Sequence, residues 1–158
     1  MKRIVATICF VLAMHAVNAQ VRLLSLDQLE DRFRQGRDTV YVVNFWATWC
    51  APCIEELDHF EKLQQEYRNE PLKVLLVSTD FRSKLETAVR PFVKRRNLKN
   101  EVFLLNEKSQ AEYIDRVSTD WSGALPATLV IQPSRKVRKL YEKAFSYDEL
   151  EKTYLNHK

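Results

Sequence analysis

The chain has 158 residues, of which 46% are hydrophobic and 29% are charged, and these proportions are typical of one globular domain. A net charge of +4 does not indicate a nucleic-acid-binding protein, because the densest basic runs, residues 94–96 and 135–139, fit solvated faces of a helix and of an edge strand. Three cysteines are too few for a small scaffold held together by disulfides.

Residues 1–19 have the pattern of an export signal. Lys2 and Arg3 form a basic start, residues 4–17 are mostly apolar, and Val17-Asn18-Ala19 offers a cleavage site before Gln20. The apolar run is shorter than the roughly 18 to 20 residues that cross a bilayer, which favours a cleaved signal over an uncleaved anchor. We therefore expect a signal peptide at residues 1–19 and one domain at residues 20–158, with no integral membrane segment in the mature chain.

Strand and helix patterns alternate through the rest of the chain. Short apolar runs bounded by turn residues predict strands at residues 21–24, 40–45, 72–78, 102–105, 127–132 and 137–141. Apolar residues spaced three and four apart predict helices at about residues 26–35, 54–67, 83–93, 109–117 and 146–155. This order predicts an α/β fold with a central mixed β-sheet, helices on both of its faces, and a hairpin formed by the last two strands.

Local signals mark the ends of these helices. Gly36 follows the first helix, and Pro91 is expected to kink or split the third. Four helix starts carry a serine followed three residues later by Glu or Gln, which predicts reciprocal capping bonds; the pairs are Ser25 with Gln28, Ser83 with Glu86, Ser109 with Glu112, and Ser146 with Glu149.

Cys50 and Cys53 stand between a strand pattern and a helix pattern. The unpaired N–H groups and the dipole at a helix N-terminus favour negative charge, so a thiol placed there ionises readily. The thiolate is the form that attacks disulfides, and a second cysteine one turn later can resolve the mixed disulfide. The spacing therefore predicts dithiol–disulfide exchange, as Cys-x-x-Cys beside alternating strands and helices generally does.

Other uses of two cysteines fit less well. A purely structural disulfide would close a loop too short to restrain the unfolded chain much. A zinc site would need a second pair of Cys or His residues, and haem attachment would need His where Ile54 stands.

The string Asn44-Phe45-Trp46-Ala47-Thr48-Trp49-Cys50-Ala51-Pro52-Cys53, together with Glu56 and Leu125-Pro126-Ala127-Thr128, resembles the exported thioredoxin-fold disulfide reductases of bacteria, the TlpA-like and ResA-like group. The resemblance implies a thioredoxin fold with an extra strand–helix insertion, a periplasmic location and no cofactor. It also implies protein disulfide substrates and a membrane thiol-reductant donor that restores the dithiol.

The same resemblance implies the site residues. Cys50 and Cys53 would be catalytic, with Glu56 as the group that handles protons or tunes thiol pKa values, since Asn44 stands where cytosolic thioredoxin has Asp. A cis bond would join Leu125 to Pro126, and the substrate contacts would be Trp49, Pro52, Leu125 and Pro126, with no metal ligand. Asp58 stands where the family often has Pro, a departure that affects the local helix and the surface beside the site.

Several of these side chains also have plainer interpretations. Glu56 could be an ordinary acid near a helix start, and His59 is expected to be exposed on its helix. Trp121 could either pack under the Pro126 loop or contact a partner, and the sequence assigns no role to Asp80 or Asp120.

Three functions remain compatible with the sequence. The favoured one is an exported reductase of disulfides in envelope proteins, and the alternative on the same fold is a disulfide oxidase or isomerase. The third is a redox-linked binding module, for example one that handles copper, although no third soft ligand is evident because Met1 and Met14 both lie in the expected signal.

Overall fold

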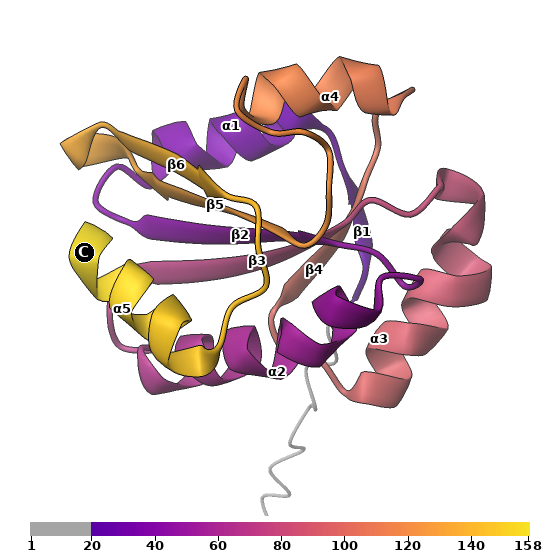
Figure 1. Cartoon of the computed structure of the whole chain (residues 1–158), viewed down its shortest axis with the longest axis horizontal. Helices are drawn as coiled ribbons and strands as arrows, with labels where there is room; N and C mark the ends of the chain where they lie inside the picture. Colours follow the sequence, from indigo (N-terminus) through magenta and orange to yellow (C-terminus); the bar gives the residue numbers. More distant parts are fainter. Residues whose placement is uncertain (1–19) are drawn as a thin grey trace, which may run out of the picture.

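The computed structural model describes residues 20–158, so the signal peptide expected at residues 1–19 lies outside the described residues. Its centre is a six-stranded mixed sheet with the order β1-β4-β3-β2-β5-β6 (Figure 1). The first four strands in that order are mutually parallel, whereas β5 runs antiparallel to both β2 and β6. The strands are β1 (Arg22–Leu24), β2 (Val40–Trp46), β3 (Leu72–Ser78), β4 (Glu101–Leu105), β5 (Ala127–Gln132) and β6 (Val137–Tyr141).

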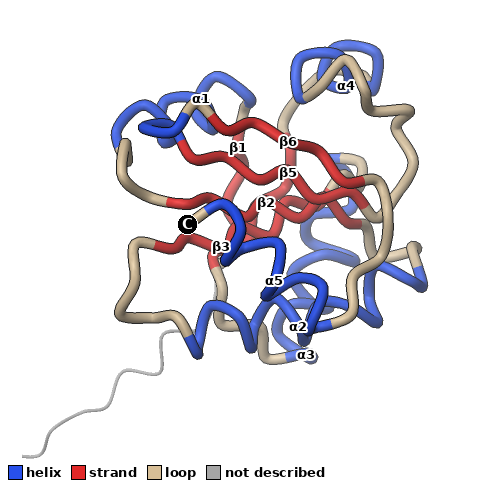
Figure 2. Tube along the Cα trace, turned by 60° about the vertical axis from the view of Figure 1, so that its left-hand side comes forward, coloured by secondary structure: helices blue, strands red, loops and turns tan. Residues whose placement is uncertain are grey.

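Helices cover both faces of the sheet, as Figures 1 and 2 show from two directions. One core lies between the sheet and helices α1 (Leu26–Gln35) and α4 (Gln110–Val117), and the other between the sheet and α2 (Ala51–Glu66), α3 (Arg90–Arg96) and α5 (Tyr147–His157). The α/β fold and the mixed sheet predicted from the sequence are confirmed, and β4 with α4 supplies an extra strand–helix pair.

Strand β2 is buried along its whole length because both faces of the sheet are covered. Its side chains alternate, so Val43 and Phe45 enter the core beneath α1 and α4, while Val42 and Trp46 enter the core beneath α2. The polar residue between Val42 and Trp46 therefore points toward α2. That residue is Asn44, which is fully buried.

The two sheet edges are protected in different ways. Strand β1 has only three residues. Strand β6 carries exposed basic side chains, as the run at residues 135–139 predicted, and Arg138 pairs with Glu30 at 2.9 Å. A short edge and a charged edge both disfavour pairing with strands of other chains.

The capping predictions are confirmed at two helices and wrong at two. Ser25 and Ser146 make both bonds of the capping box, with Gln28 and Glu149 respectively. Ser109 precedes α4 without capping it through its side chain.

Ser83 lies inside a 3₁₀ turn, Arg82–Lys84, and is followed by a π-helical turn, Leu85–Val89, before α3 begins. Pro91 explains this departure, because proline has no N–H to donate and its ring crowds the preceding turn.

Gly36 ends α1 as predicted, but for a different reason. Its φ of −102° lies outside the left-handed region. A Cβ at this position would overlap the hydroxyl of Tyr41, which donates a hydrogen bond to the carbonyl of Arg32 at 2.8 Å. Glycine is needed here for space.

Within residues 20–158, none of the helices has the length and apolar character needed to cross a membrane.

Candidate active site

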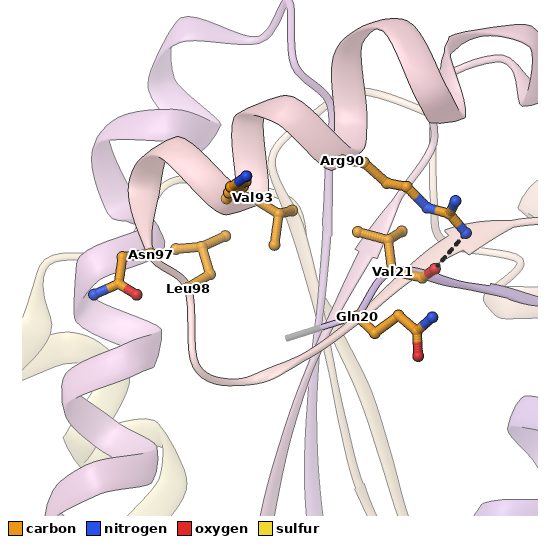
Figure 3. A pocket seen from close by; sticks show the side chains of 7 residues that line it. Gln20, Val21, Arg90, Val93, Asn97 and Leu98 are labelled. Carbon is orange, nitrogen blue, oxygen red and sulfur yellow. Dashed lines mark hydrogen bonds between the residues drawn. The ribbon is translucent and has the colours of Figure 1, made fainter. Parts of the chain in front are cut away.

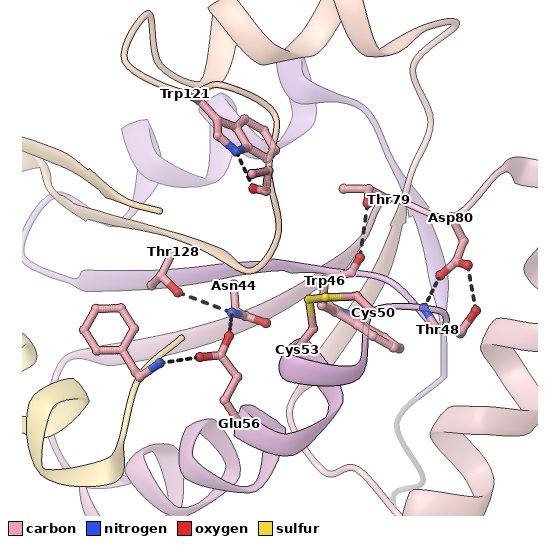
Figure 4. Close-up of a disulfide and its surroundings, with 12 residues drawn as sticks. Asn44, Trp46, Thr48, Cys50, Cys53, Glu56, Thr79, Asp80, Trp121 and Thr128 are labelled. Carbon is pink, nitrogen blue, oxygen red and sulfur yellow. Dashed lines mark hydrogen bonds between the residues drawn. A yellow bond between two sulfur atoms is a disulfide. The ribbon is translucent and has the colours of Figure 1, made fainter. Parts of the chain in front are cut away.

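Cys50 and Cys53 lie where β2 leads into α2 (Figure 4). Cys50 is the N-cap residue of α2, and its N–H donates to the carbonyl of Ala47 at 3.1 Å. Pro52 fits the first turn of the helix, where the N–H groups have no partner within the helix. The two sulfurs form a disulfide with an S–S distance of 2.01 Å. Cys50 is 6% exposed and Cys53 is fully buried, so both residues are buried and Cys50 is the one that keeps some contact with solvent.

The first turn of α2 carries no acidic side chain. The positive end of the helix dipole and the free N–H groups therefore act on Cys50 without an opposing charge from that turn. This environment favours the thiolate of Cys50 whenever the disulfide is reduced.

The loop before β5 lies beside the cysteine pair. The peptide bond from Leu125 to Pro126 is cis, as expected, and Pro126 is buried while Leu125 is half-buried. Because Ala127 pairs with Phe45 near the end of β2, the register brings this loop to the strand end that leads to Cys50.

Trp121 supports this loop from beneath. Its indole N–H donates to the carbonyl of Ala124 at 2.9 Å, and its ring packs against Phe45 with centroids 4.9 Å apart. The side chain is 4% exposed, so of the two interpretations open for Trp121, packing under the loop is the correct one.

Glu56 is buried one turn after Cys53, with 2% of its surface exposed. One carboxylate oxygen accepts a hydrogen bond from Nδ2 of Asn44 at 2.8 Å, and the other accepts from the N–H of Phe145 at 2.7 Å. Burial raises the pKa of Glu56, while the two hydrogen bonds and the charge of His59 oppose that rise. This burial excludes the interpretation of Glu56 as an ordinary, solvent-exposed acid near the start of a helix.

Asn44 connects Glu56 with the disulfide region. Its Nδ2 also lies 3.3 Å from Oγ1 of Thr128, which accepts the second hydrogen bond. Its Oδ1 is buried and has no hydrogen-bond partner among residues 20–158, and Figure 4 shows this oxygen on the side facing the disulfide. Asn44 therefore keeps one unused acceptor in the buried interior of the site.

His59 does not lie where the sequence placed it. It is half-buried, and its Nδ1 lies 2.9 Å from the carbonyl oxygen of Phe145. Glu56 and His59, one turn apart on α2, thus bind the N–H and the C=O of the same residue at the start of α5. The expectation of an exposed His59 was wrong because its contact lies 86 positions away in the sequence.

Asp80 is a site residue that sequence analysis missed. Its carboxylate accepts hydrogen bonds from the N–H of Thr48 at 2.9 Å, from Oγ1 of Thr48 at 2.7 Å and from Oγ of Ser78 at 2.7 Å. These bonds fix the turn between β2 and Cys50 to the end of β3. The only signal was the position of Asp80 just after a parallel strand adjacent to β2.

Of the four expected substrate-contact residues, Trp49 and Pro52 are exposed beside Cys50, whereas Leu125 is half-buried and Pro126 is buried. Trp49 is 68% exposed, and Pro52 is exposed on the first turn of α2. No group of three or more His, Cys, Asp or Glu side chains suited to a metal ion occurs within the described part of the chain.

Two of the hollows on the surface of residues 20–158 are of similar size. One, of about 350 Å³, borders Trp49. The other, of about 300 Å³, lies between Val21 and α3, and Figure 3 shows Arg90 reaching across it to donate to the carbonyl of Val21 at 3.3 Å. It borders Gln20, the first residue that the structure describes, and none of the cysteine-pair residues lines it.

The sheet order, the Cys-x-x-Cys pair at the start of α2 and the cis-proline loop beside it define a thioredoxin-fold protein of the redox type. The chain belongs to the AhpC/TSA family, whose sequence model matches residues 13–140.

Named relatives agree with this assignment. The chain is 30% identical over 115 residues to the thiol-disulfide oxidoreductase ResA of Oceanobacillus iheyensis, covering 73% of this chain and 55% of that protein. It is 38% identical over 93 residues to the thioredoxin-like protein YneN of Bacillus subtilis, covering 58% of this chain and 53% of that protein. The chain thus spans about half the length of the curated relatives it matches. The expected resemblance to the ResA-like group is confirmed.

A solved structure agrees with the fold. The thiol:disulfide interchange protein of Chlorobium tepidum TLS superposes with a TM-score of 0.64 at 20% identity, covering 79% of this chain and 83% of that one. The thioredoxin fold expected from the sequence is therefore confirmed.

Proposed function

We propose that this chain is an exported thiol–disulfide oxidoreductase that reduces disulfides of envelope proteins through Cys50 and Cys53. The observation that carries the proposal is the asymmetry of the pair. Cys50 caps the positive end of α2 and keeps 6% of its surface exposed, while Cys53 has none. Such a pair can attack a foreign disulfide with one sulfur and release the product with the other.

The reaction proceeds in two exchanges. The Cys50 thiolate attacks one sulfur of the partner disulfide, forms a mixed disulfide and releases the other partner sulfur as a thiolate. Cys53 then loses its proton and attacks the sulfur of Cys50, which forms the Cys50–Cys53 disulfide and releases the second partner thiolate. Two electrons pass to the partner, whose thiolates take protons from solvent.

In this mechanism Glu56 takes the proton that Cys53 loses. Its buried position and raised pKa suit a group that accepts a proton from a neighbouring thiol, and it lies one turn from Cys53 on the same helix. Trp49, Pro52, Leu125 and Pro126 contact the partner around Cys50. A membrane thiol-reductant donor returns the pair to the dithiol by the reverse exchange.

Trapping tests this function directly. With Cys53→Ala the mixed disulfide cannot be resolved, so substrate proteins should accumulate on Cys50 in the cell envelope and be identifiable by mass spectrometry. The matched control, Cys50→Ala, should trap none of them, and reduction of insulin with dithiothreitol should fall to the uncatalysed rate.

The direction of the disulfide exchange and the export of the chain need separate measurements. A glutathione redox titration should give a midpoint near that of thioredoxin, about −270 mV, and a value near −120 mV would assign the chain to the oxidases instead. Mass spectrometry of the full chain expressed with its leader should find a mature N-terminus at Gln20. An intact leader would contradict the cleaved signal.

A further inference from the structure

A groove of about 350 Å³ begins at Trp49, the residue before Cys50. One wall is the segment of residues 79–83, which follows β3, and the other is the segment of residues 105–110, which joins β4 to α4. Tyr113 of α4 also lines it. A chain that presents a disulfide to Cys50 can therefore continue directly into this groove.

The rim of the groove exposes two aromatic side chains. Phe81 is 81% exposed and Trp49 is 68% exposed, and the only other large apolar side chain that is comparably exposed in residues 20–158 is Leu155, at 47%. Exposed aromatic side chains that border a hollow are typical of binding surfaces, because they offer large apolar area at a low cost in conformational entropy.

The acidic side chains that line the groove are held by hydrogen bonds within the protein. The carboxylate of Asp80 is occupied by Thr48 and Ser78. Glu107 accepts a hydrogen bond from the N–H of Leu26 at 2.7 Å and lies 3.9 Å from the guanidinium of Arg116.

By contrast, the side chains of Arg82 and Lys108 are exposed, and neither forms an ion pair with any residue that the structure describes. Arg82 donates one hydrogen bond to Oδ1 of Asn106 at 3.3 Å, and both bases remain without an acidic partner among the described residues.

We propose that this groove binds an acidic, extended segment of the substrate protein adjacent to its disulfide. An apolar side chain of the segment packs between Trp49 and Phe81. The carboxylates of the segment's acidic residues face Arg82 and Lys108. This inference rests on the proposed function and adds a substrate class to it, namely disulfides flanked by acidic and apolar residues.

The test measures how fast Cys50 forms a mixed disulfide with defined peptides. The full chain carries Cys9→Ser and Cys53→Ala, so that Cys50 is its only thiol. Two cystine peptides are compared that share one leucine and differ only in carrying either Glu or Lys beside it. Each rate is divided by the rate with hydroxyethyl disulfide, a small neutral reagent that reports the intrinsic reactivity of Cys50.

The acidic peptide should react about fivefold faster than the basic one at low salt, and the ratio should fall toward one as salt screens the charges. Arg82→Glu with Lys108→Glu should reverse the preference, and Phe81→Ser should slow both peptides alike. Lys139→Glu, at an exposed position on β6, should leave the ratio unchanged.

Equal rates for the two peptides, or an equal effect of Lys139→Glu, would overturn the groove proposal alone. Failure of Cys50 to react even with hydroxyethyl disulfide would instead overturn the proposed function.

Discussion

Nδ2 of Asn44 lies 2.8 Å from Oε1 of Glu56, and both side chains are closed off from solvent. The amide donates a hydrogen bond but brings no charge, and no Lys or Arg within residues 20–158 pairs with this carboxylate. The negative charge of Glu56 is therefore buried without a salt-bridge partner, which is why its pKa is raised.

Glu56→Gln should make the free energy of unfolding depend less on pH. Because the folded state raises the pKa of Glu56 above its ordinary value of 4.5, that state holds the proton more tightly than the unfolded chain does. The stabilisation by this proton is complete below pH 4.5 and is lost as pH rises through the folded pKa. The stability advantage of Gln over Glu should grow across that window in urea unfolding of the disulfide form.

The control is Glu55→Gln, an exposed neighbour on the same helix. This change should leave the slope of stability against pH as it is in the parent chain. An equal slope in the Glu56→Gln variant and the parent would show that the buried carboxylate keeps an ordinary pKa.

Asn44→Asp should place two carboxylates in direct contact and destabilise the fold most at neutral and higher pH. Neighbouring carboxylates cannot both ionise cheaply, so the pair should share one proton and unfold more easily as pH rises. The double variant with Glu56→Gln should recover most of the loss. The measurement is urea unfolding near pH 5 and pH 8, and a loss independent of pH would point to packing damage instead.

Asp80→Ala should cost about 2 to 4 kcal/mol of stability, because hydrogen bonds to a charged group contribute more than neutral ones and the buried donors lose their acceptor. The bond from Oγ1 of Thr48 should appear as coupling of about 1 kcal/mol in a double-mutant cycle with Thr48→Val, which removes the hydroxyl but keeps the backbone N–H that also donates to Asp80.

Asp120→Ala is the matched control for that cycle, since Asp120 is an exposed loop acid that looks equivalent in the sequence. It should change the unfolding free energy by less than about 0.5 kcal/mol. If Asp80→Ala and Thr48→Val changed the free energy of unfolding additively, the proposed coupling between the two side chains would be refuted.

Gly123→Ala should destabilise the cis-proline loop for two separable reasons. Gly123 has a φ of +91°, which costs roughly 1 to 2 kcal/mol for a residue with a side chain. An added Cβ would also lie 2.7 Å from Cδ1 of Ile114. Ile114→Val should relieve the contact but not the backbone strain, so the double variant should recover only part of the loss in thermal or urea unfolding. Full recovery would show that the backbone tolerates alanine.

Most of the fold could be predicted because its signals are local. The apolar run of β2 and the spacing of Leu57 and Phe60 on α2 depend only on nearby residues, as do the caps at Ser25 and Ser146. The start of the helix near Ser83 was wrong because a serine–glutamate pattern cannot show how Pro91 widens the turn before it.

From the residues alone, the site was predictable only where one short string contains it, whereas the cis bond at Pro126 was expected from the family resemblance. Cys50, Cys53 and Glu56 lie on one helix start, so their proximity follows from the sequence. The contacts of Asp80 with Thr48 and of His59 with Phe145 join positions 32 and 86 residues apart. Such pairs depend on how strands and helices are ordered in the sheet, which no local pattern contains.

Phe145 is bound through both of its backbone groups, by Glu56 at its N–H and by His59 at its C=O. This ties the segment that leads into α5 to the acid–base behaviour of Glu56 on α2. If α5 loosens, the carboxylate loses one of its two donors and retains its proton to a still higher pH. In the proposed mechanism, α5 therefore influences how readily Cys53 loses its proton, although it contributes no side chain to the exchange itself.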